Sequence, residues 1–264
     1  MYDFNYHRPR TAAEAVAAVS SAEDGQFLAG GMTVIPTMKQ RLAHPSDLVD
    51  LAGVSDLGGI RESGGAIVVG AMATHAGVAD SDLVRQKCPA LADLAGGIGD
   101  PQVRNRGTIG GSIANNDPAA DYPAAVLGLG ATVHTNEREI AADNFFTGLF
   151  ETALKDGEII TKVSFPLPES AGYAKFPNPA SRYAVVGVMA VKTGSGARVA
   201  VTGAGACVFR ASELERALGA DFSATALDGA SVSAEGLNSD LHASAEYRAH
   251  LVVVMARRAV DSAS

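Results

Sequence analysis

Apolar and polar residues along this chain fall into short blocks whose period changes several times. Residues 11–20, "TAAEAVAAVS", have helix-forming composition, and Thr11 with Glu14 three residues later has the spacing of a capping box. The stretch "GQFLAGGMTVIPTMKQRL" predicts a short buried strand, a Gly-Gly turn, and then a helix from about Val34 to Leu42. "DLVDL" at 47–51 is typical of another short strand.

The same mixture continues along the chain. Gly64 and Gly65 mark a hairpin turn before a strand within 63–75. The two strand-like runs "YAVVGVMAVK" and "ARVAVTGAGACV" are joined by "TGSG", which favours an antiparallel hairpin. The other expected elements are a helical region at 76–98 interrupted at Pro89, a helix and strand within "YPAAVLGLGATVHT", a strand at 157–168, a helix at 211–219 and a closing helix in "SAEYRAHLVVVMARRAVDSA".

This alternation of short strands and helices predicts an α+β chain in two parts. The proline-rich segment 166–179 is the best candidate for the boundary between them. We therefore expect domains at 1–168 and 175–264, the first with subdomains at about 1–55 and 56–168.

Composition narrows the class of protein. The chain has 264 residues with 47% hydrophobic and 19% charged residues, which allows a sizeable core. Its net charge of −8 argues against a general nucleic-acid-binding protein, which would present a basic face. The start lacks a basic region followed by an apolar one, and the apolar runs are too short to span a membrane. We therefore expect a soluble, cytoplasmic protein.

Metal and thiol chemistry have little support in the sequence. Two cysteines, Cys88 and Cys207, leave one disulfide open but are too few for an iron–sulfur cluster or a four-cysteine zinc site. The six histidines show no spacing typical of metal ligands. No nucleophile elbow and no pair of acid and base residues is evident. The chain therefore carries no visible apparatus for breaking bonds.

The segment "AGGMT" at 29–33 is a candidate anion site. A strand that ends in Gly-Gly just before a helix exposes backbone N–H groups, which bind phosphate or pyrophosphate. Taken alone, this feature is better explained by a tight turn at Gly30 and Gly31. The segment "GTIGGS" at 107–112 offers a second such loop, with hydroxyls on Thr108 and Ser112. Two loops together favour a diphosphate ligand, held outside the Rossmann and P-loop geometries because neither fingerprint is present.

Polar side chains crowd the stretch that follows the second loop. Asn115, Asn116, Asp117 and Asp121 offer amides to a heterocycle edge and carboxylates to ribose hydroxyls. Asp117 precedes Pro118, a pattern that also starts helices, so capping is an equal alternative. Asp121 lies about a turn farther on, where a cap is a weaker explanation.

Arg104 and Arg106 lie just before the second loop and could pair with phosphates, with carboxylates or with a partner protein. The chain thus combines ligand-binding loops with no catalytic side chains. A cofactor that brings its own chemistry, such as a flavin, fits this combination.

Four strings, taken in order, carry a family resemblance: "AGGMTVIPTMKQRLAHPSDLVDL", "GAMATH", "PQVRNRGTIGGSIANNDPAADYPAAVL" and "FPNPASRYAVVGVMAV". Over essentially its whole length the chain resembles the FAD-binding medium subunits of molybdenum hydroxylases, a group with carbon monoxide dehydrogenase medium subunits and xanthine dehydrogenase flavin domains. The resemblance implies a two-part FAD-binding domain of the vanillyl-alcohol-oxidase type and a smaller C-terminal α+β domain.

The resemblance also implies a set of FAD-binding residues. The two Gly-Gly loops would hold the pyrophosphate through backbone amides, although Met32 and Thr33 stand where members often have His or Gln and Ser. Asp121 would contact the cofactor, Ile159 or Ile160 and Lys175 would lie near one of its ends, and Tyr183 would lie close to the isoalloxazine ring. The full set is Ala29, Gly30, Gly31, Met32, Thr33, Thr108, Ile109, Gly110, Gly111, Ser112, Asn115, Asp117, Asp121, Ile159, Ile160, Lys175 and Tyr183.

The implied role is that of an electron-transfer flavoprotein subunit with no catalytic or metal-binding residues of its own. A large subunit would carry the molybdopterin cofactor and a small one the [2Fe–2S] clusters, in a dimer of heterotrimers that could lie at the inner face of the membrane. Two alternatives stay open: a self-sufficient flavin oxidase or dehydrogenase acting on a small organic substrate, and a nucleotide-binding assembly protein. The substrate, the electron acceptor and the roles of Arg104 and Arg106 are left undecided.

Overall fold

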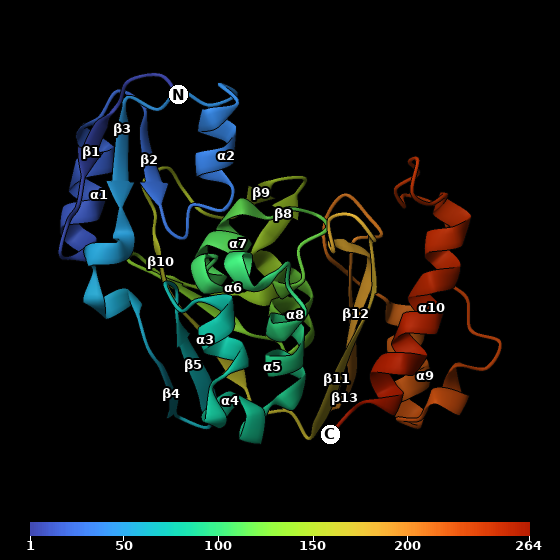
Figure 1. The fold of residues 1–264 in the computed structure, drawn as a ribbon. Coiled ribbons are helices and arrows are strands. Elements are labelled where there is room, and N and C mark those ends of the chain that lie inside the picture. The colour runs from blue at the N-terminus through green and yellow to red at the C-terminus, as the bar shows by residue number, and fades with distance from the viewer.

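The computed structural model describes residues 1–264 and places three larger sheets and one two-stranded sheet along the chain (Figure 1). The first is a parallel sheet of three strands in the order β1-β3-β2, which lies at the upper left of Figure 1. Its strands and their helices are β1 (Asn5–His7), α1 (Ala12–Ser21), β2 (Gly25–Leu28), α2 (Val34–Lys39) and β3 (Asp47–Asp50). The predicted helix start is confirmed, because the Thr11 hydroxyl accepts a hydrogen bond from the Glu14 N–H at 3.1 Å.

A five-stranded antiparallel sheet in the order β4-β5-β10-β6-β7 forms the centre. Its strands are β4 (Ile60–Ser63), β5 (Ala66–Gly70), β6 (Thr132–Thr135), β7 (Glu139–Ala141) and β10 (Ile160–Pro166). The predicted turn at Gly64 and Gly65 is confirmed, and both glycines have positive φ angles, of 60° and 75°. A small separate hairpin, β8 (Phe146–Gly148) and β9 (Glu151–Thr152), lies beside this sheet.

The core of the central part has 32 buried residues and extends to the third sheet. Six short helices accompany the central sheet, and all but the fourth contribute to this core. They are α3 (His75–Ala79), α4 (Asp82–Lys87), α5 (Pro89–Gly96), α6 (Pro101–Arg106), α7 (Ile109–Asn115) and α8 (Tyr122–Gly128). The expectation of a second loop at 107–112 was wrong for most of that segment, because α7 begins at Ile109, directly after α6 and a two-residue connection. Asp100 and Thr108 cap these helices, accepting from the N–H groups of Val103 and Gly111.

The third sheet is antiparallel, in the order β11-β12-β13-β14, and includes the predicted hairpin across "TGSG". It contains β11 (Ser170–Pro177), β12 (Ala184–Thr193), β13 (Gly196–Thr202) and β14 (Phe209–Arg210), with helices α9 (Ser212–Ala220) and α10 (Ala245–Asp261). Its helices cover one face, whereas Met189, Val191 and Ala200 of the other face belong to the central core. The proline-rich segment is itself largely strand β11, so only residues 167–169 separate the second sheet from the third.

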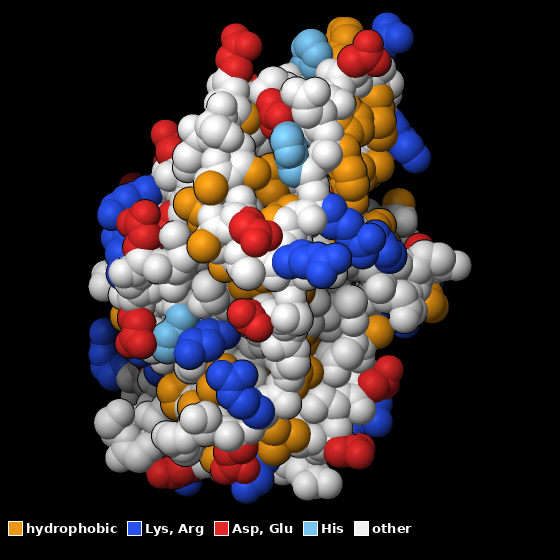
Figure 2. Space-filling view, turned by 90° about the vertical axis from the view of Figure 1, so that its left-hand side faces the viewer, with side chains coloured by type: hydrophobic (Ala, Val, Ile, Leu, Met, Phe, Trp, Pro, Cys, Tyr) orange, Lys and Arg blue, Asp and Glu red, His pale blue; other side chains and the backbone are white.

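Figure 2 shows the face that includes the N-terminal sheet. Acidic and basic side chains are interspersed over this face, and apolar side chains gather near its top. Cys88 and Cys207 are both free, and no cluster of three metal-ligating side chains occurs. None of the helices combines the length and the apolar composition that a membrane crossing requires.

Candidate functional site

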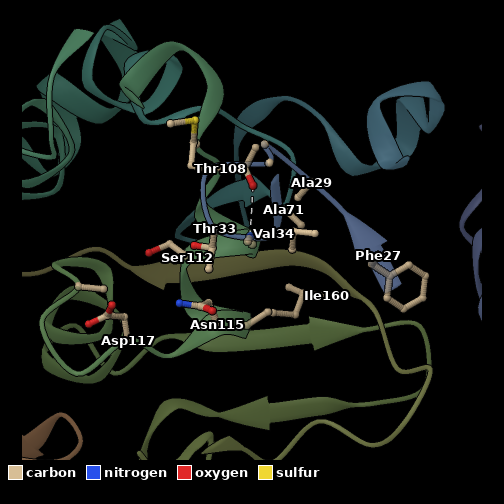
Figure 3. A pocket seen from close by; sticks show the side chains of 18 of the residues that line it. Phe27, Ala29, Thr33, Val34, Ala71, Thr108, Ser112, Asn115, Asp117 and Ile160 are labelled. Carbon is tan, nitrogen blue, oxygen red and sulfur yellow. Dashed lines mark hydrogen bonds between the residues drawn. The ribbon is translucent and has the colours of Figure 1, made fainter. Parts of the chain in front are cut away.

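A cavity of about 770 Å³ lies where the N-terminal sheet meets the central part of the chain (Figure 3). Most of its walls come from five segments that are far apart in the sequence, at 25–34, 71–75, 98–121, 150–160 and 181–183, and Val19 and Leu51 complete them. This volume falls in the upper part of the range of about 300–1,000 Å³ that is typical of ligand pockets. The cavity is therefore the first place to look for the predicted site residues.

The segment after β2 lines the cavity with unused backbone donors. Gly31 has φ 76°, a left-handed conformation, and Thr33 precedes the first turn of α2 without a side-chain cap. None of the N–H groups from Gly30 to Thr33 donates a hydrogen bond to another part of the chain. Successive free amides at a turn of this kind form an anion-binding concavity. The sequence pattern therefore pointed to a real feature of the backbone.

The second Gly-Gly segment has a different structure from the one expected. Gly110 donates its N–H to the carbonyl oxygen of Ala71 at 2.8 Å, and Gly111 donates to the Thr108 hydroxyl at 3.1 Å. The N–H groups of Ile109 and Ser112 are likewise bonded, to Ala73 and Thr108. The expectation that these amides are free for a pyrophosphate is therefore wrong.

The residues of this segment differ in whether their side chains reach the cavity. The Ile109 side chain is fully buried in the core and does not reach the cavity. By contrast, Ser112 and Asn115 line the cavity, and Ser112 lies close to Thr33 in Figure 3. They offer hydroxyl and amide groups to a polar ligand.

Asp117 lines the cavity and belongs to a turn rather than to a helix start. Its carboxylate accepts from the N–H of Ala119 at 2.9 Å, and α8 begins only at Tyr122. The helix-capping alternative is therefore wrong for Asp117. Asp121 immediately precedes α8 but makes no capping hydrogen bond either.

Asp121 is the centre of a buried polar cluster at the cavity wall. It accepts a hydrogen bond from the Tyr173 hydroxyl at 2.5 Å and lies 3.0 Å from the Lys175 ammonium group, which also donates to the Gly97 carbonyl oxygen. Burial raises the pKa of Asp121 above its ordinary value, against the opposing effects of Lys175 and Tyr173. Lys175 does not line the cavity, so it acts on the site through Asp121.

The turn that holds Asp117 and Asp121 is fastened to the third sheet. Ala184 and Gly203 donate their N–H groups to the carbonyl oxygens of Ala119 and Pro118, and the Thr202 hydroxyl lies 2.6 Å from the Ala120 carbonyl oxygen. Tyr183, just before β12, lines the same end of the cavity and is 47% exposed. Both main parts of the chain therefore build this end of the site.

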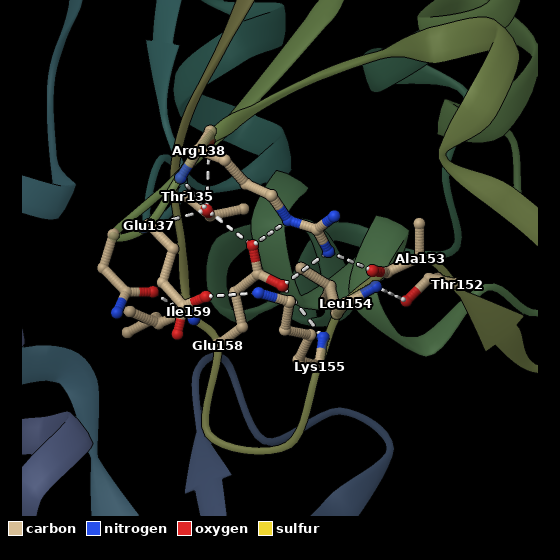
Figure 4. A network of polar contacts seen from close by, with 10 residues as sticks. Thr135, Glu137, Arg138, Thr152, Ala153, Leu154, Lys155, Glu158 and Ile159 are labelled. Atoms are coloured by element: carbon tan, nitrogen blue, oxygen red, sulfur yellow. Dashed lines mark hydrogen bonds and ion pairs between the residues drawn. The ribbon is translucent and has the colours of Figure 1, made fainter.

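Ile159 and Ile160 line the cavity from a loop held by the polar network of Figure 4. The Glu158 carboxylate accepts from the Arg138 guanidinium at 2.9 and 3.0 Å, from the Thr135 hydroxyl at 2.7 Å and from the Lys155 N–H at 2.9 Å. Arg138 is the main reason why the pKa of Glu158 is lowered to about 2. This ion pair fixes the loop rather than offering a free carboxylate.

The structure shows what the side chains of Arg104 and Arg106 contact, which the sequence left open. Arg104 donates to the carbonyl oxygens of Ile98 and Gly99 and thereby braces the loop before α6. The Arg106 side chain is exposed and makes no hydrogen bond or ion pair, while its carbonyl oxygen faces Gly30. Neither guanidinium lines the cavity.

Sequence reasoning did not single out several residues of the cavity. His75 lies in its wall, 5% exposed, with Nδ1 unpaired, and burial lowers its pKa to about 4. Phe150, at the tip of the β8–β9 hairpin, also lines it. "GAMATH" contained a signal for His75, because the polar Thr-His pair follows an apolar strand. Nothing in the local pattern marked Phe150.

With this geometry in hand, the chain was compared with known proteins. Residues 2–168 match the profile described as "FAD binding domain in molybdopterin dehydrogenase", and residues 171–263 match "CO dehydrogenase flavoprotein C-terminal domain". The chain is 40% identical to the carbon monoxide dehydrogenase medium chain of Afipia carboxidovorans, covering 98% of this chain and 96% of the relative. It is 36% identical to the nicotine 6-hydroxylase medium subunit of Paenarthrobacter nicotinovorans, with the same two coverages.

Solved structures give the same picture. A Cu,Mo-CO dehydrogenase in its cyanide-inactivated form contains a chain that superposes with a TM-score of 0.88 at 37% identity, covering 98% of this chain and 96% of that one. A chain of quinoline 2-oxidoreductase from Pseudomonas putida 86 superposes with a TM-score of 0.88 at 31% identity and the same coverages. The predicted fold class, a flavin-binding part followed by a C-terminal part of the CO dehydrogenase flavoprotein type, is confirmed.

Proposed function

Because this chain belongs to the family of FAD-binding medium subunits of molybdenum hydroxylases, we propose that it is the electron-transfer subunit of such an enzyme. It is an FAD-binding oxidoreductase subunit, and the molybdenum and iron–sulfur cofactors belong to other subunits. When bound, FAD would supply redox chemistry, accepting electrons that arrive from partner [2Fe–2S] clusters and releasing them to an external acceptor.

The free amides of Gly30 to Thr33 are the observation that carries the placement of the cofactor. A diphosphate is the only strongly anionic part of FAD, and these amides form an anion-binding turn inside a cavity of suitable size. Gly31 provides the left-handed backbone that the turn requires. We place the pyrophosphate at this segment alone, since the amides of Ile109 to Ser112 are already bonded. The residues present therefore fit the cofactor.

The other residues that line the cavity provide the remaining contacts that we propose. Ser112 and Asn115 would donate to or accept from the sugar and ribityl hydroxyls, and the Asp117 carboxylate would accept from them. Asp121 would be held in place by Lys175 and Tyr173, and Ile159 and Ile160 would supply apolar wall. Tyr183 would lie against the isoalloxazine ring. Thr108, Gly110, Gly111 and Ala29 would shape the cavity floor, and Ile109 would act only as core support.

The expected partners are a large subunit with the molybdopterin cofactor and a small subunit with [2Fe–2S] clusters. Several similar proteins are named as a medium chain, a medium subunit or a subunit of a complex, which supports partners of this kind. We further propose a dimer of heterotrimers in the cytoplasm, and the domain division at 1–168 and 175–264. Because the similar chains come from enzymes named for carbon monoxide, nicotine and quinoline, we place substrate recognition in a different subunit.

Purification of the chain alone and together with its co-expressed partners tests the proposal. We expect flavin absorbance in the complex, release of FAD on denaturation, and bleaching of the flavin when the enzyme's substrate is added without an acceptor. A complex that holds molybdenum and iron but neither contains nor takes up FAD would contradict it. Turnover of an organic substrate by the isolated chain would instead favour a self-sufficient flavin oxidase.

A further inference from the structure

The tip of the β8–β9 hairpin has an unusual composition for a tight turn. Leu149 and Phe150 occupy it, with exposed fractions of 54% and 56%. Phe150 has φ 55°, in the left-handed region that glycine or asparagine adopts far more readily than an aromatic residue does. Neither residue packs against any of the three hydrophobic cores. The chain therefore keeps a strained, exposed aromatic side chain that contributes nothing to its own core.

The hairpin is nevertheless held firmly at its base. Asn116, 1% exposed, directs its side-chain amide to the carbonyl oxygens of Gly148 at 2.9 Å and Glu151 at 2.7 Å, on either side of the tip. Asn116 itself adopts the left-handed conformation that ends α7, at φ 43°. Its two sequence neighbours, Asn115 and Asp117, line the cavity. The position of the tip is therefore set by the same helix end that shapes the site.

Only one of the two residues at the tip of the hairpin contacts the cavity. Phe150 lines the cavity, whereas Leu149 does not. Asn116 joins the hairpin to the start of the Asp117 turn, so Phe150 lies at the end of the cavity that this turn lines. Tyr183 lines the same end, where burial and the charges of Asp117 and Asp121 raise the pKa of its hydroxyl. An exposed aromatic ring at a cavity wall is suited to contact with a planar ring system.

We propose that Phe150 is a positioning residue for the cofactor. The phenyl ring of Phe150 packs against the planar isoalloxazine ring of FAD at the Asp117 end of the cavity. Asn116 fixes the backbone that presents it. This inference rests on the proposed function, because it requires that the cavity bind FAD. It accounts for the retention of an aromatic residue at a backbone conformation that disfavours it.

The test uses the protein as purified with its partners, after removal and titration of FAD. Phe150→Gly relieves the backbone conformation and removes the ring, so we expect an unchanged or higher melting temperature of the flavin-free protein. We expect the dissociation constant for FAD to rise by about tenfold through loss of an aromatic contact. The visible absorption bands of the bound flavin should shift when the packed ring is lost, and Phe150→Tyr, which keeps an aromatic ring, should retain the affinity and the absorption spectrum of the parent.

Two controls separate ring contact from other roles. Leu149→Gly alters the same tip without touching the cavity and should leave FAD affinity unchanged. Arg41→Gly relieves a similar conformation, φ 61°, at an exposed site outside the cavity, and should also leave FAD affinity unchanged.

Four outcomes would overturn the inference. Unchanged affinity and absorption spectrum in Phe150→Gly would do so while leaving the proposed function intact, whereas a parent protein that takes up no FAD would remove both. Equal loss of affinity in Leu149→Gly would show that order in the hairpin, not the ring, matters. A marked fall in melting temperature in Phe150→Gly would show that the ring belongs to the fold.

Discussion

Gly30 lies against the main-chain carbonyl group of Arg106, so closely that a Cβ atom on residue 30 would stand 2.0 Å from the carbonyl oxygen. This contact brings the turn after β2 against the junction of α6 and α7, and so closes one side of the cavity in which we place FAD. It explains the first glycine of the pair by packing, while Gly31 is explained by its positive φ angle.

Replacing Gly30 by alanine should therefore separate these two segments. A contact of 2.0 Å with backbone cannot be relieved by a side-chain rotation, so the turn must move. We expect FAD affinity to fall at least about tenfold, as measured by titration of the flavin-free protein. Gly219→Ala, in α9, meets no atom closer than 3.8 Å and serves as the control. Equal affinity in Gly30→Ala and parent would contradict the close approach.

The glycines at the start of α7 should separate stability from binding. A Cβ atom at Gly110 would lie 2.7 Å from the Ala71 carbonyl oxygen, so Gly110→Ala should lower the free energy of unfolding by about 1–3 kcal/mol. A Cβ atom at Gly111 would lie 3.0 Å from the Thr108 hydroxyl and 3.4 Å from the Ala29 side chain, at the cavity wall. Gly111→Ala should mainly weaken FAD binding. Chemical denaturation and FAD titration of both variants measure the two effects. A larger loss of stability in Gly111→Ala, or a larger loss of FAD affinity in Gly110→Ala, would contradict the prediction.

His75 should make the flavin-free chain sensitive to mild acid. Burial, with a smaller effect of Arg104, lowers its pKa from 6.5 to about 4, so the unfolded chain binds an additional proton between these values. The contribution of His75 to the free energy of unfolding is fully present above pH 6.5 and is lost as the pH falls toward 4, by up to about 3 kcal/mol. His75→Gln should flatten this part of the pH profile of unfolding free energy. The exposed His242→Gln should not; an unchanged slope in His75→Gln would be decisive against the prediction.

The Glu158–Arg138 pair gives a second pH dependence in a lower range. The hydrogen bonds from Arg138, Lys155 and Thr135 lower the pKa of Glu158 from 4.5 to about 2, so its contribution is present above pH 4.5 and is lost as the pH falls toward 2. Glu158→Gln should lower the unfolding free energy at neutral pH by about 2 kcal/mol, and this difference should shrink in acid. Glu137→Gln, which removes a more exposed pair with Lys155, should cost less than about 1 kcal/mol.

Lys175 and Asp121 should behave as one unit. Lys175→Met leaves the buried Asp121 carboxylate without its counter-charge and should lower the unfolding free energy by about 3 kcal/mol. The double variant Asp121→Asn with Lys175→Met should recover a large part of that loss, which a double-mutant cycle measures. Additive effects of the two substitutions would show that the pair is not coupled. FAD affinity should respond more to Asp121→Asn than to Lys175→Met, because only Asp121 lines the cavity.

Local signals were enough to find one wall of the site. The strand, the Gly-Gly pair and the following helix at 25–39 lie next to one another in sequence, so the free amides of the turn could be inferred from the pattern alone. The helices at 101–115 were missed because they have no apolar stripe. Their caps were nevertheless legible: Asp100 before Pro101, and Thr108 three residues before Gly111.

Other features depend on contacts between distant segments. Asn116 reaches Gly148 and Glu151 across more than 30 residues, and no periodicity in either segment announces that contact. The same holds for Lys175, whose charge is used by Asp121 rather than directly in the cavity. The amides of Gly110 and Gly111 were misassigned because their acceptors, Ala71 and the Thr108 side chain, become apparent only in the folded chain.

The hydrogen bonds from β12 and β13 to the turn at 118–120 bear on how such subunits can be recombined. A chimera joined near residue 169 would combine a turn from one parent with a sheet from another, although the joint itself lies in only a three-residue connection. The mismatch would fall on Asp117, Asp121 and Tyr183 rather than at the splice. The two halves of this chain therefore form a matched pair, and exchanging either one alone between relatives would disturb the end of the cavity that is lined by Asp117 and Tyr183 first.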